Sequence, residues 1–190
     1  MATLDEITML VRELTPAQRD QVRAFIATLR ADASAPPSGW RFDFLEHFAQ
    51  AAASSSREPG GMEIKVGEAI CAGVPRPALW EHPPVRGAAS VGYLVPIPTG
   101  VRQVALKFAI GLRDGSELPR ERMVAFRVIV NGWKLWSAVK NSRAWEEHTI
   151  QMPQLGSNVA RIEFVTDGLG DNRWNWAVWA EPRLEGEARE

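Results

Sequence analysis

Polar and apolar residues at the start of the chain alternate with the spacing of an amphipathic helix. Thr3 and Glu6 have the S/T-x-x-E spacing of a capping box, in which each side chain accepts a hydrogen bond from the other residue's free backbone amide. The spacing predicts a short helix that ends at about Glu13.

A second helix is predicted from Thr15 to about Ala31, because Thr15 and Gln18 repeat the capping arrangement. Its apolar residues fall at i, i+3, i+4 and i+7 and form one stripe. They are Val22, Phe25, Ile26 and Leu29. Two helices this short need a packing partner. A linker rich in Pro and Ser, Asp32–Gly39, follows them. We therefore expect residues 1–35 to form a helical hairpin whose stripe contacts another copy of the chain, with the main domain as the alternative surface.

A third helix is predicted over Trp40–Ser54, since its large apolar residues share one helical face. They are Trp40, Phe44, Phe48 and Ala51. The segment SSSREPGG then ends the helix, so we expect residues 36–61 to be a helix and a linker.

From Met62 the apolar spacing changes to the period of two that is typical of strands. The alternating positions are Met62, Ile64 and Val66; Val91, Tyr93 and Val95; Val104, Leu106, Phe108 and Ile110; Phe126, Val128 and Val130; Trp133 and Leu135; His148, Ile150 and Met152; Ala160, Ile162 and Phe164; and Trp174, Trp176 and Val178. Asn131-Gly132 is the dipeptide best suited to a tight hairpin. The pattern predicts an antiparallel jelly-roll β-sandwich over residues 62–184, preceded by the helical segment. The charged residues 185–190 are expected to be a disordered tail.

The composition excludes several classes of protein. The chain of 190 residues has a formal net charge of −1 and no block of basic residues, so nucleic-acid binding is not favoured. One cysteine, Cys71, excludes an internal disulfide. No stretch approaches the roughly 18 apolar residues of a membrane span, and the acidic N-terminus does not resemble a signal peptide. We expect a soluble protein in the cytoplasm.

Signatures of catalysis are absent from the sequence. Ala88–Gly92 has the form A-x-S-x-G, but a nucleophile elbow needs a helix after the serine, and here a strand is predicted. Glu146 and Glu147 are adjacent and point to opposite faces of a strand. The histidines lie in three different elements, and they are His47, His82 and His148. The chain is therefore predicted not to be an enzyme.

The loop over residues 167–172 has two interpretations. Its side-chain oxygens, above all those of Asp167 and Asp171, are of the kind that binds Ca²⁺. Alternatively, Asp and Asn side chains cap the turns of a polar loop. Both interpretations remain open.

Tryptophans are concentrated in the β-rich part, and they are Trp80, Trp133, Trp136, Trp145, Trp174, Trp176 and Trp179. At least half are expected to pack in the core. In the last strand we expect Trp176 and Val178 in the core and Trp179 on the opposite face, and in the hairpin we expect Trp136 on the face opposite to Trp133 and Leu135.

An exposed indole beside polar groups can cover the C–H face of a sugar while the polar groups bind its hydroxyls. The residues that meet this description are predicted to bind a ligand. They are Trp80, His82, Trp133, Asp171, Asn172, Arg173 and Trp174.

Four segments resemble the galactose-binding-like β-sandwiches, and among these the NPCBM-type carbohydrate-binding modules. The segments are Trp80–Pro83, Ile110–Gly115, Phe126–Gly132 and Trp176–Leu184, and the resemblance covers about residues 62–184. It implies a jelly roll, a structural Ca²⁺ and glycan binding by loops at one end. The opening Leu14–Gln18 is similar to small helical hairpins that dimerise bacterial proteins.

Two functions remain open. The chain is either a lectin-like module in which the N-terminal helices raise the valency, or a cytoplasmic protein–protein interaction or assembly subunit that uses the sandwich as a scaffold. Glycan binding is preferred because of the resemblance.

Overall fold

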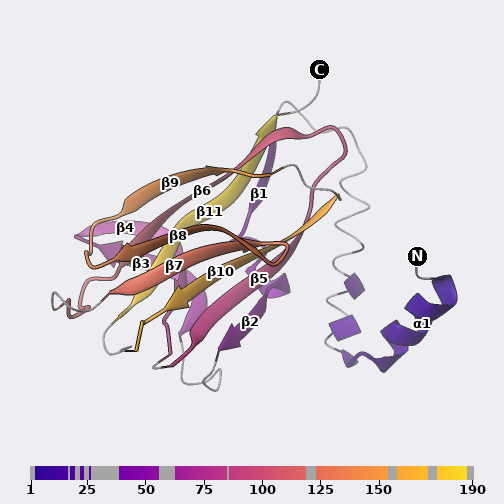
Figure 1. Cartoon of the computed structure of the whole chain (residues 1–190), viewed down its shortest axis with the longest axis horizontal. Coiled ribbons are helices and arrows are strands. Elements are labelled where there is room, and N and C mark those ends of the chain that lie inside the picture. The colour runs from indigo at the N-terminus through magenta and orange to yellow at the C-terminus, as the bar shows by residue number, and fades with distance from the viewer. Residues whose placement is uncertain are drawn as a thin grey trace.

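Two antiparallel β-sheets face each other in this protein, and a helix extends from its N-terminal end, as a computed structural model shows (Figure 1). The structure describes residues 3–16, 18–19, 22–23, 26, 39–55, 63–84, 86–118, 123–153, 158–170 and 175–187. The elements are α1 (Leu4–Glu13), β1 (Trp40–Asp43), η1 (Phe48–Gln50), β2 (Ala52–Ser55), β3 (Ile64–Cys71), β4 (Val74–Glu81), β5 (Ala88–Pro96), β6 (Arg102–Leu112), β7 (Val124–Val130), β8 (Trp133–Lys140), β9 (Glu146–Gln151), β10 (Val159–Asp167) and β11 (Ala177–Glu187).

The predicted fold class is confirmed. One sheet has the strand order β3–β4–β11–β6–β9, with β1 also paired to β11, and the other has the order β2–β5–β10–β7–β8. The chain passes from one sheet to the other after every strand except β3 and β7, which pair with the next strand in the same sheet. Most consecutive strands therefore lie in opposite sheets, as in a jelly-roll sandwich.

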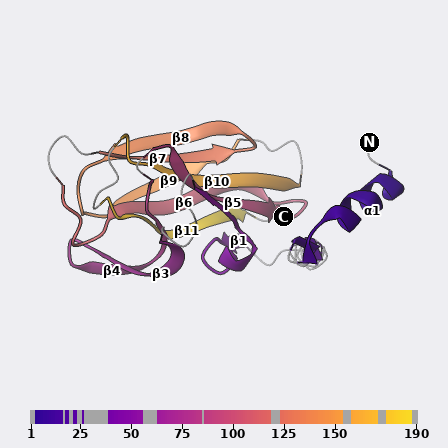
Figure 2. The same ribbon diagram turned by 90° about the horizontal axis from the view of Figure 1, so that it is seen from below.

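The N-terminal capping predictions are confirmed. Glu6 accepts a hydrogen bond of 2.6 Å from the Thr3 amide, and Thr3 Oγ1 accepts one of 3.3 Å from the Glu6 amide. Gln18 and Thr15 form the same reciprocal pair, at 2.9 and 3.3 Å. Helix α1 extends away from the two sheets (Figure 2). Within the part of the chain that the structure describes, no helix has the length and apolarity needed to cross a membrane.

The predicted helix over Trp40–Ser54 is wrong, because this segment forms β1, η1 and β2. Trp40, Phe42 and Phe44 are all buried in the core, which is the alternation of a strand. The spacing of Trp40 and Phe44 fits a helix as well, and the pairing of β1 with β11 and of β2 with β5 decides between the two. The sandwich therefore begins at Trp40 and not at Met62.

The predicted disordered tail is wrong for residues 185–187, which belong to β11. Glu185 pairs with Ala105 of β6 and with Arg41 of β1. Its carboxylate contacts Lys107 and Arg183, and hydrogen bonds from these two cations lower the pKa of Glu185 to about 2. The charge of Glu185 is thus compatible with a place in β11, because Lys107 and Arg183 pair with it on the same sheet.

The main core lies between the sheets and is largely aromatic. Trp179 is fully buried there and makes edge-to-face contacts with Phe108, Phe126 and Phe164, with ring centroids 5.0–5.3 Å apart. The predicted alternation along β11 is confirmed, and Val178 is buried as predicted. The predicted orientation of the tryptophans is wrong, because Trp179 packs in the main core, whereas Trp176 is only half-buried at the end of the sandwich.

The predicted opposition of Leu135 and Trp136 is also wrong. Val128 pairs with Trp136 and Ile129 with Lys134, so Leu135 is the extra residue of a β-bulge. Leu135 and Trp136 therefore both pack against the main core.

A second, smaller core lies on the other face of the β4–β11–β6 sheet. It consists of Ala69, Cys71, Ala78, Ala109, Val178 and Ala180, with Trp80 and Trp145 packed against it. A Cβ atom at Gly111 would lie 2.7 Å from Cys71 Sγ and from the Trp145 ring, so only glycine permits this approach. Burial raises the pKa of the Cys71 thiol to about 12. Through Cys71, the end of β3 thus packs against Gly111 of β6, so the β3–β4 hairpin folds over the outer face of the sheet.

Candidate functional site

Two half-buried tryptophans lie together at the end of the sandwich where β4 and β6 end and β11 begins, the end away from the C-terminus in Figure 1. Trp80 belongs to the end of β4, and Trp176 directly precedes β11. Arg113, which follows β6, joins them, because its amide donates a hydrogen bond of 3.0 Å to the Trp176 carbonyl oxygen. Glu63, His82 and Ala177 complete the lining of a small hollow between these residues.

The guanidinium of Arg113 is stacked on the indoles. Its Cζ atom lies 3.3 Å from the ring centroid of Trp80 and 5.2 Å from that of Trp176. Lys65 Nζ lies 4.2 Å from the same Trp80 centroid. Such cation–π contacts hold long, flexible side chains in one arrangement. The site is therefore ordered before any ligand arrives.

A glycine is required beside Trp176. Gly115 has a φ of +90°, and a Cβ atom there would lie 2.7 Å from the Trp176 ring. The Arg113–Asp114–Gly115 turn thus supplies both the stacked cation and the space for the indole.

Positive charge dominates the described part of the site. Glu63 is the one carboxylate close to the two cations among the described residues, at 3.6 Å from Lys65 Nζ and 3.6 Å from Arg113 Nη1. The pKa of Arg113 is lowered, since burial disfavours its charged form more than Glu63 favours it. The guanidinium has thus lost part of its hydration, and among the described residues its carboxylate partner is Glu63 at 3.6 Å.

His82 connects the β4–β5 loop to the segment before β11. Its Nδ1 atom lies 2.9 Å from the backbone carbonyl oxygen of Asn175. A carbonyl oxygen can only accept, so Nδ1 carries the hydrogen in this contact. His82 is half-buried at the rim of the hollow.

The predicted ligand-binding residues are only partly brought together. Trp80 and His82 lie at this end, next to Asn175 and Trp176. Asp171, Asn172, Arg173 and Trp174 lie outside the described residues. Trp133 does not join the site, because it pairs with Val130 at the tip of the β7–β8 hairpin, at the other end of the sandwich. There it is 80% exposed.

Four residues of the site were not predicted, and they are Glu63, Lys65, Arg113 and Trp176. Trp176 was assigned to the core by the strand alternation. The one sequence signal is the Asp114-Gly115 pair that follows Arg113, because Asp-Gly is typical of a tight turn, and the structure gives Gly115 a positive φ. The contact between Lys65 and Trp80 depends on the register of β3 and β4, which the sequence does not give.

A calcium site at Asp167 does not fit its observed contacts. One carboxylate oxygen of Asp167 accepts hydrogen bonds of 3.1 and 3.2 Å from Arg127, and the other accepts one of 2.9 Å from the Leu169 amide. The latter contact is the self-capped turn of the alternative interpretation. Within the described ranges no group of three His, Cys, Asp or Glu side chains could hold a metal ion. Asp171, the other predicted ligand, lies outside them.

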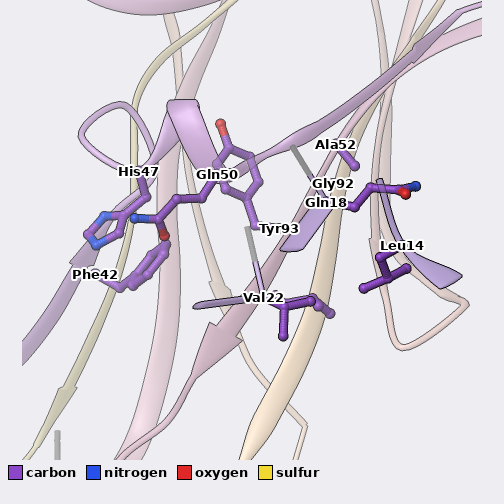
Figure 3. Close-up of a pocket in the computed structure, with 10 residues that line it drawn as sticks. Leu14, Gln18, Val22, Phe42, His47, Gln50, Ala52, Gly92 and Tyr93 are labelled. Atoms are coloured by element: carbon purple, nitrogen blue, oxygen red, sulfur yellow. The ribbon is translucent and has the colours of Figure 1, made fainter. Parts of the chain in front are cut away.

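An apolar cavity of about 290 Å³ lies between the N-terminal helical residues and the edge of the sandwich (Figure 3). Leu14, Gln18 and Val22 line it from one side, and Phe42 and Tyr93 from the other. Val22 of the predicted stripe thus faces the sandwich of its own chain. Ile26 is largely exposed, and Phe25 and Leu29 lie outside the described residues.

The two other histidines have structural contacts. His47 stacks on Phe42 with ring centroids 4.1 Å apart, and His148 packs on Phe108 and Trp136. Neither lies in the hollow around Trp80, Arg113 and Trp176, which we call the tryptophan site.

No family model and no curated protein sequence matches this chain. Similar solved structures are carbohydrate-binding modules. The tandem CBM51 modules of Sp3GH98, a family 98 glycoside hydrolase from Streptococcus pneumoniae, have 11% identity and a TM-score of 0.49, and the match covers 74% of this chain and 42% of that one. This chain thus matches less than half of the tandem-module chain.

Two single modules are similar over nearly their whole length. TmCBM61, in complex with β-1,4-galactotriose, has 16% identity and a TM-score of 0.47, with 78% of this chain and 99% of that chain covered. A CBM36 module in complex with calcium and xylotriose has 12% identity and a TM-score of 0.41, with 78% and 99% covered. The similarity of the N-terminal helices to dimerisation hairpins stays a prediction.

Proposed function

We propose that this chain is a non-catalytic carbohydrate-binding module that binds its ligand at the end formed by Trp80, His82, Arg113 and Trp176. The observation that supports this most directly is the pair of half-buried indoles held in place by one stacked guanidinium. Indole edges and faces cover the C–H surface of a pyranose, and the cationic and imidazole groups around them bind oxygen atoms. Because the groups are already positioned, little ordering cost opposes binding.

A glycan array tests this proposal. We expect the full chain to bind at least one glycan, and we expect Trp176→Ala to lose that binding while its melting temperature stays close to that of the unchanged chain. Trp133→Ala is the matched control, since this indole is exposed at the other end. A folded chain that binds nothing on the array contradicts the proposal, and loss of binding in Trp133→Ala alone moves the site to the other end.

We further propose that the N-terminal helices join copies of the chain and so raise the apparent affinity through effective concentration. Ile7 and Leu10 lie on one face of α1 and are 48% and 61% exposed, although a ten-residue helix has little stability without packing. Light scattering should show an oligomer that Ile7→Glu with Leu10→Glu converts to a monomer. A monomeric unchanged chain at high concentration contradicts this part, and the sugar site is unaffected by that outcome.

A protein–protein interaction module is the second candidate function, and the edge strand β3 favours it. Val66 and Ile70 lie on the same face of this strand and are exposed. An exposed apolar edge is a surface on which another protein can pack. If this is the function, Val66→Lys with Ile70→Lys should abolish co-purification of a defined partner from the host, and Trp176→Ala should not.

A further inference from the structure

Among the described residues, the two cations of the tryptophan site share a single carboxylate. Glu63 lies 3.6 Å from both Lys65 and Arg113, which is longer than a charge-assisted hydrogen bond. The Glu63 side chain is 61% exposed, whereas that of Arg113 is 23% exposed. The carboxylate that these two cations share is therefore loosely held at the entrance of the site, whereas Arg113 is the more buried partner.

Arg113 has more hydrogen-bonding capacity than the described residues around it use. A guanidinium has five N–H donors, and within the described part of the chain the one carboxylate near them is that of Glu63. Both indoles lie against the flat face of the Arg113 guanidinium, so the N–H groups at its edge remain for an acceptor. Guanidinium N–H groups match two oxygens of one carboxylate in geometry. A group of this kind has a high preference for an oxyanion.

A neutral sugar does not supply such a group. Its hydroxyls can accept hydrogen bonds from Arg113, but they do not compensate the two positive charges that are desolvated when a ligand covers Lys65 and Arg113. A carboxylate on the pyranose ring accepts these hydrogen bonds and also carries a negative charge that offsets the desolvation of the cations. The C–H groups of the same ring can contact the exposed parts of the two half-buried indoles beside Arg113, so one monosaccharide unit uses the cations and the tryptophans together.

We propose that the ligand is an acidic, carboxylate-bearing sugar of the uronic acid class, and that its carboxylate binds between Lys65 and Arg113 in the place that Glu63 takes in the free protein. This inference rests on the proposed function. Glu63 then acts as a competitor that the ligand displaces. Removal of the Glu63 charge should strengthen ligand binding.

The first experiment compares the ligand with and without its charge. Titration calorimetry on the full chain would use tetragalacturonic acid and tetraglucuronic acid, each against its own methyl ester. We expect at least one acid to bind ten-fold or more tightly than its ester at low salt, and this difference to shrink as the salt concentration rises. Equal binding of acid and ester overturns the inference. Sodium acetate in excess should compete weakly, and if it displaces the sugar completely, the site binds carboxylate ions rather than sugars.

The second experiment uses four variants with the acid that binds. Arg113→Met and Lys65→Met should each weaken binding ten-fold or more, and Glu63→Gln should tighten it several-fold. Arg161→Met is the control, because Arg161 is exposed on β10 and its ion pair is with Glu163. Lys65→Met keeps the inference testable if Arg113→Met does not fold, since Lys65 is exposed on β3. Weaker binding in Glu63→Gln overturns the inference, because Glu63 would then position Arg113 instead of competing with the ligand.

The outcomes separate the two proposals. Binding of neutral glycans alone on the array overturns the uronic acid inference and leaves the carbohydrate-binding function in place. No binding of any acidic or neutral glycan overturns both.

Discussion

The indole N–H of Trp179 donates a hydrogen bond of 2.7 Å to a carboxylate oxygen of Glu81, and both side chains are fully buried. The other oxygen of Glu81 is buried without a hydrogen-bond partner in the described structure. Burial raises the pKa of Glu81 well above its ordinary value of 4.5, and the hydrogen bond from Trp179 opposes this only in part. Glu81 is therefore a core residue that prefers to be protonated.

Glu81 makes the stability of the fold depend on pH. A raised folded-state pKa means that the native chain holds a proton that the unfolded chain releases above about pH 4.5. The contribution of Glu81 to the free energy of unfolding is fully present below that pH. It then falls by about 1.4 kcal/mol for each pH unit as the pH rises toward the folded-state pKa. Glu81→Gln keeps an acceptor for Trp179, and we expect a flatter profile of unfolding free energy between pH 5 and 8 by urea titration. The exposed Glu117→Gln is the control, and parallel profiles for Glu81→Gln and the unchanged chain contradict the prediction.

Gly111→Ala should destabilise the protein by about 1–3 kcal/mol, as over-packing of a closed core does. The added methyl group would meet Cys71 Sγ and the Trp145 ring at 2.7 Å. Gly92→Ala is the matched control, since its Cβ atom would lie 3.5 Å from its nearest neighbour. Urea unfolding measures both, and Cys71→Ala in the Gly111→Ala background should recover part of the loss. Equal stability of the two glycine variants would show that the hairpin is not closed on β6.

Asp114 should stabilise the turn of the β3–β4 hairpin. Its two carboxylate oxygens accept hydrogen bonds of 2.9 and 2.8 Å from the amides of Ala72 and Gly73, and both turn residues have positive φ. Hydrogen bonds to charged groups contribute about 1.5–3 kcal/mol each when they are protected from water, and less when they are exposed as here. We expect Asp114→Ala to cost about 1–2 kcal/mol, and hydrogen exchange of the two amides to accelerate. Unchanged exchange at residues 72 and 73 contradicts the assignment.

Replacement of Trp133 and replacement of Trp136 should have very different effects on stability, although both residues lie in β8. Trp136 packs edge-on against Phe108, 5.0 Å between ring centroids, and contacts Trp179 and His148, so Trp136→Ala should cost about 3 kcal/mol. Trp133 is exposed, so Trp133→Ala should change stability by less than about 0.5 kcal/mol. Thermal unfolding compares the two variants. A large loss of stability in Trp133→Ala would mean that this indole packs on another surface.

Local chemistry in the sequence was sufficient for the capped helix and for most strands. Thr3 with Glu6 identifies the start of α1, and Asn131-Gly132 identifies a hairpin whose two turn residues have positive φ. Strand β4 was missed, because Pro75 and Pro77 break the expected pattern, and prolines are tolerated where a strand's amides are not needed for pairing. The pairing of β4 with β3 and β11, and not the strand propensity of its own residues, decides that this segment is a strand.

The same limit applies to the site. Trp80 and His82 could be selected because an aromatic and a polar residue stand close together in the sequence. Arg113 and Lys65 contact Trp80 through loop geometry and through the register of β3 with β4, respectively. Contacts between residues that are distant in the chain depend on the tertiary fold. The direction in which Trp176 and Trp179 point depends likewise on which face of β11 meets the other sheet.

The burial of Cys71 has a practical consequence for work in solution. This is the one cysteine of the chain, and its thiol lies in the small core with a pKa of about 12, so little thiolate is present near neutral pH. Reagents that modify cysteine should therefore not react with Cys71 while the protein is folded. A cysteine introduced at the exposed Trp133 or on α1 would then be the single reactive position, and a fluorophore or spin label could be attached there with the natural Cys71 left in place.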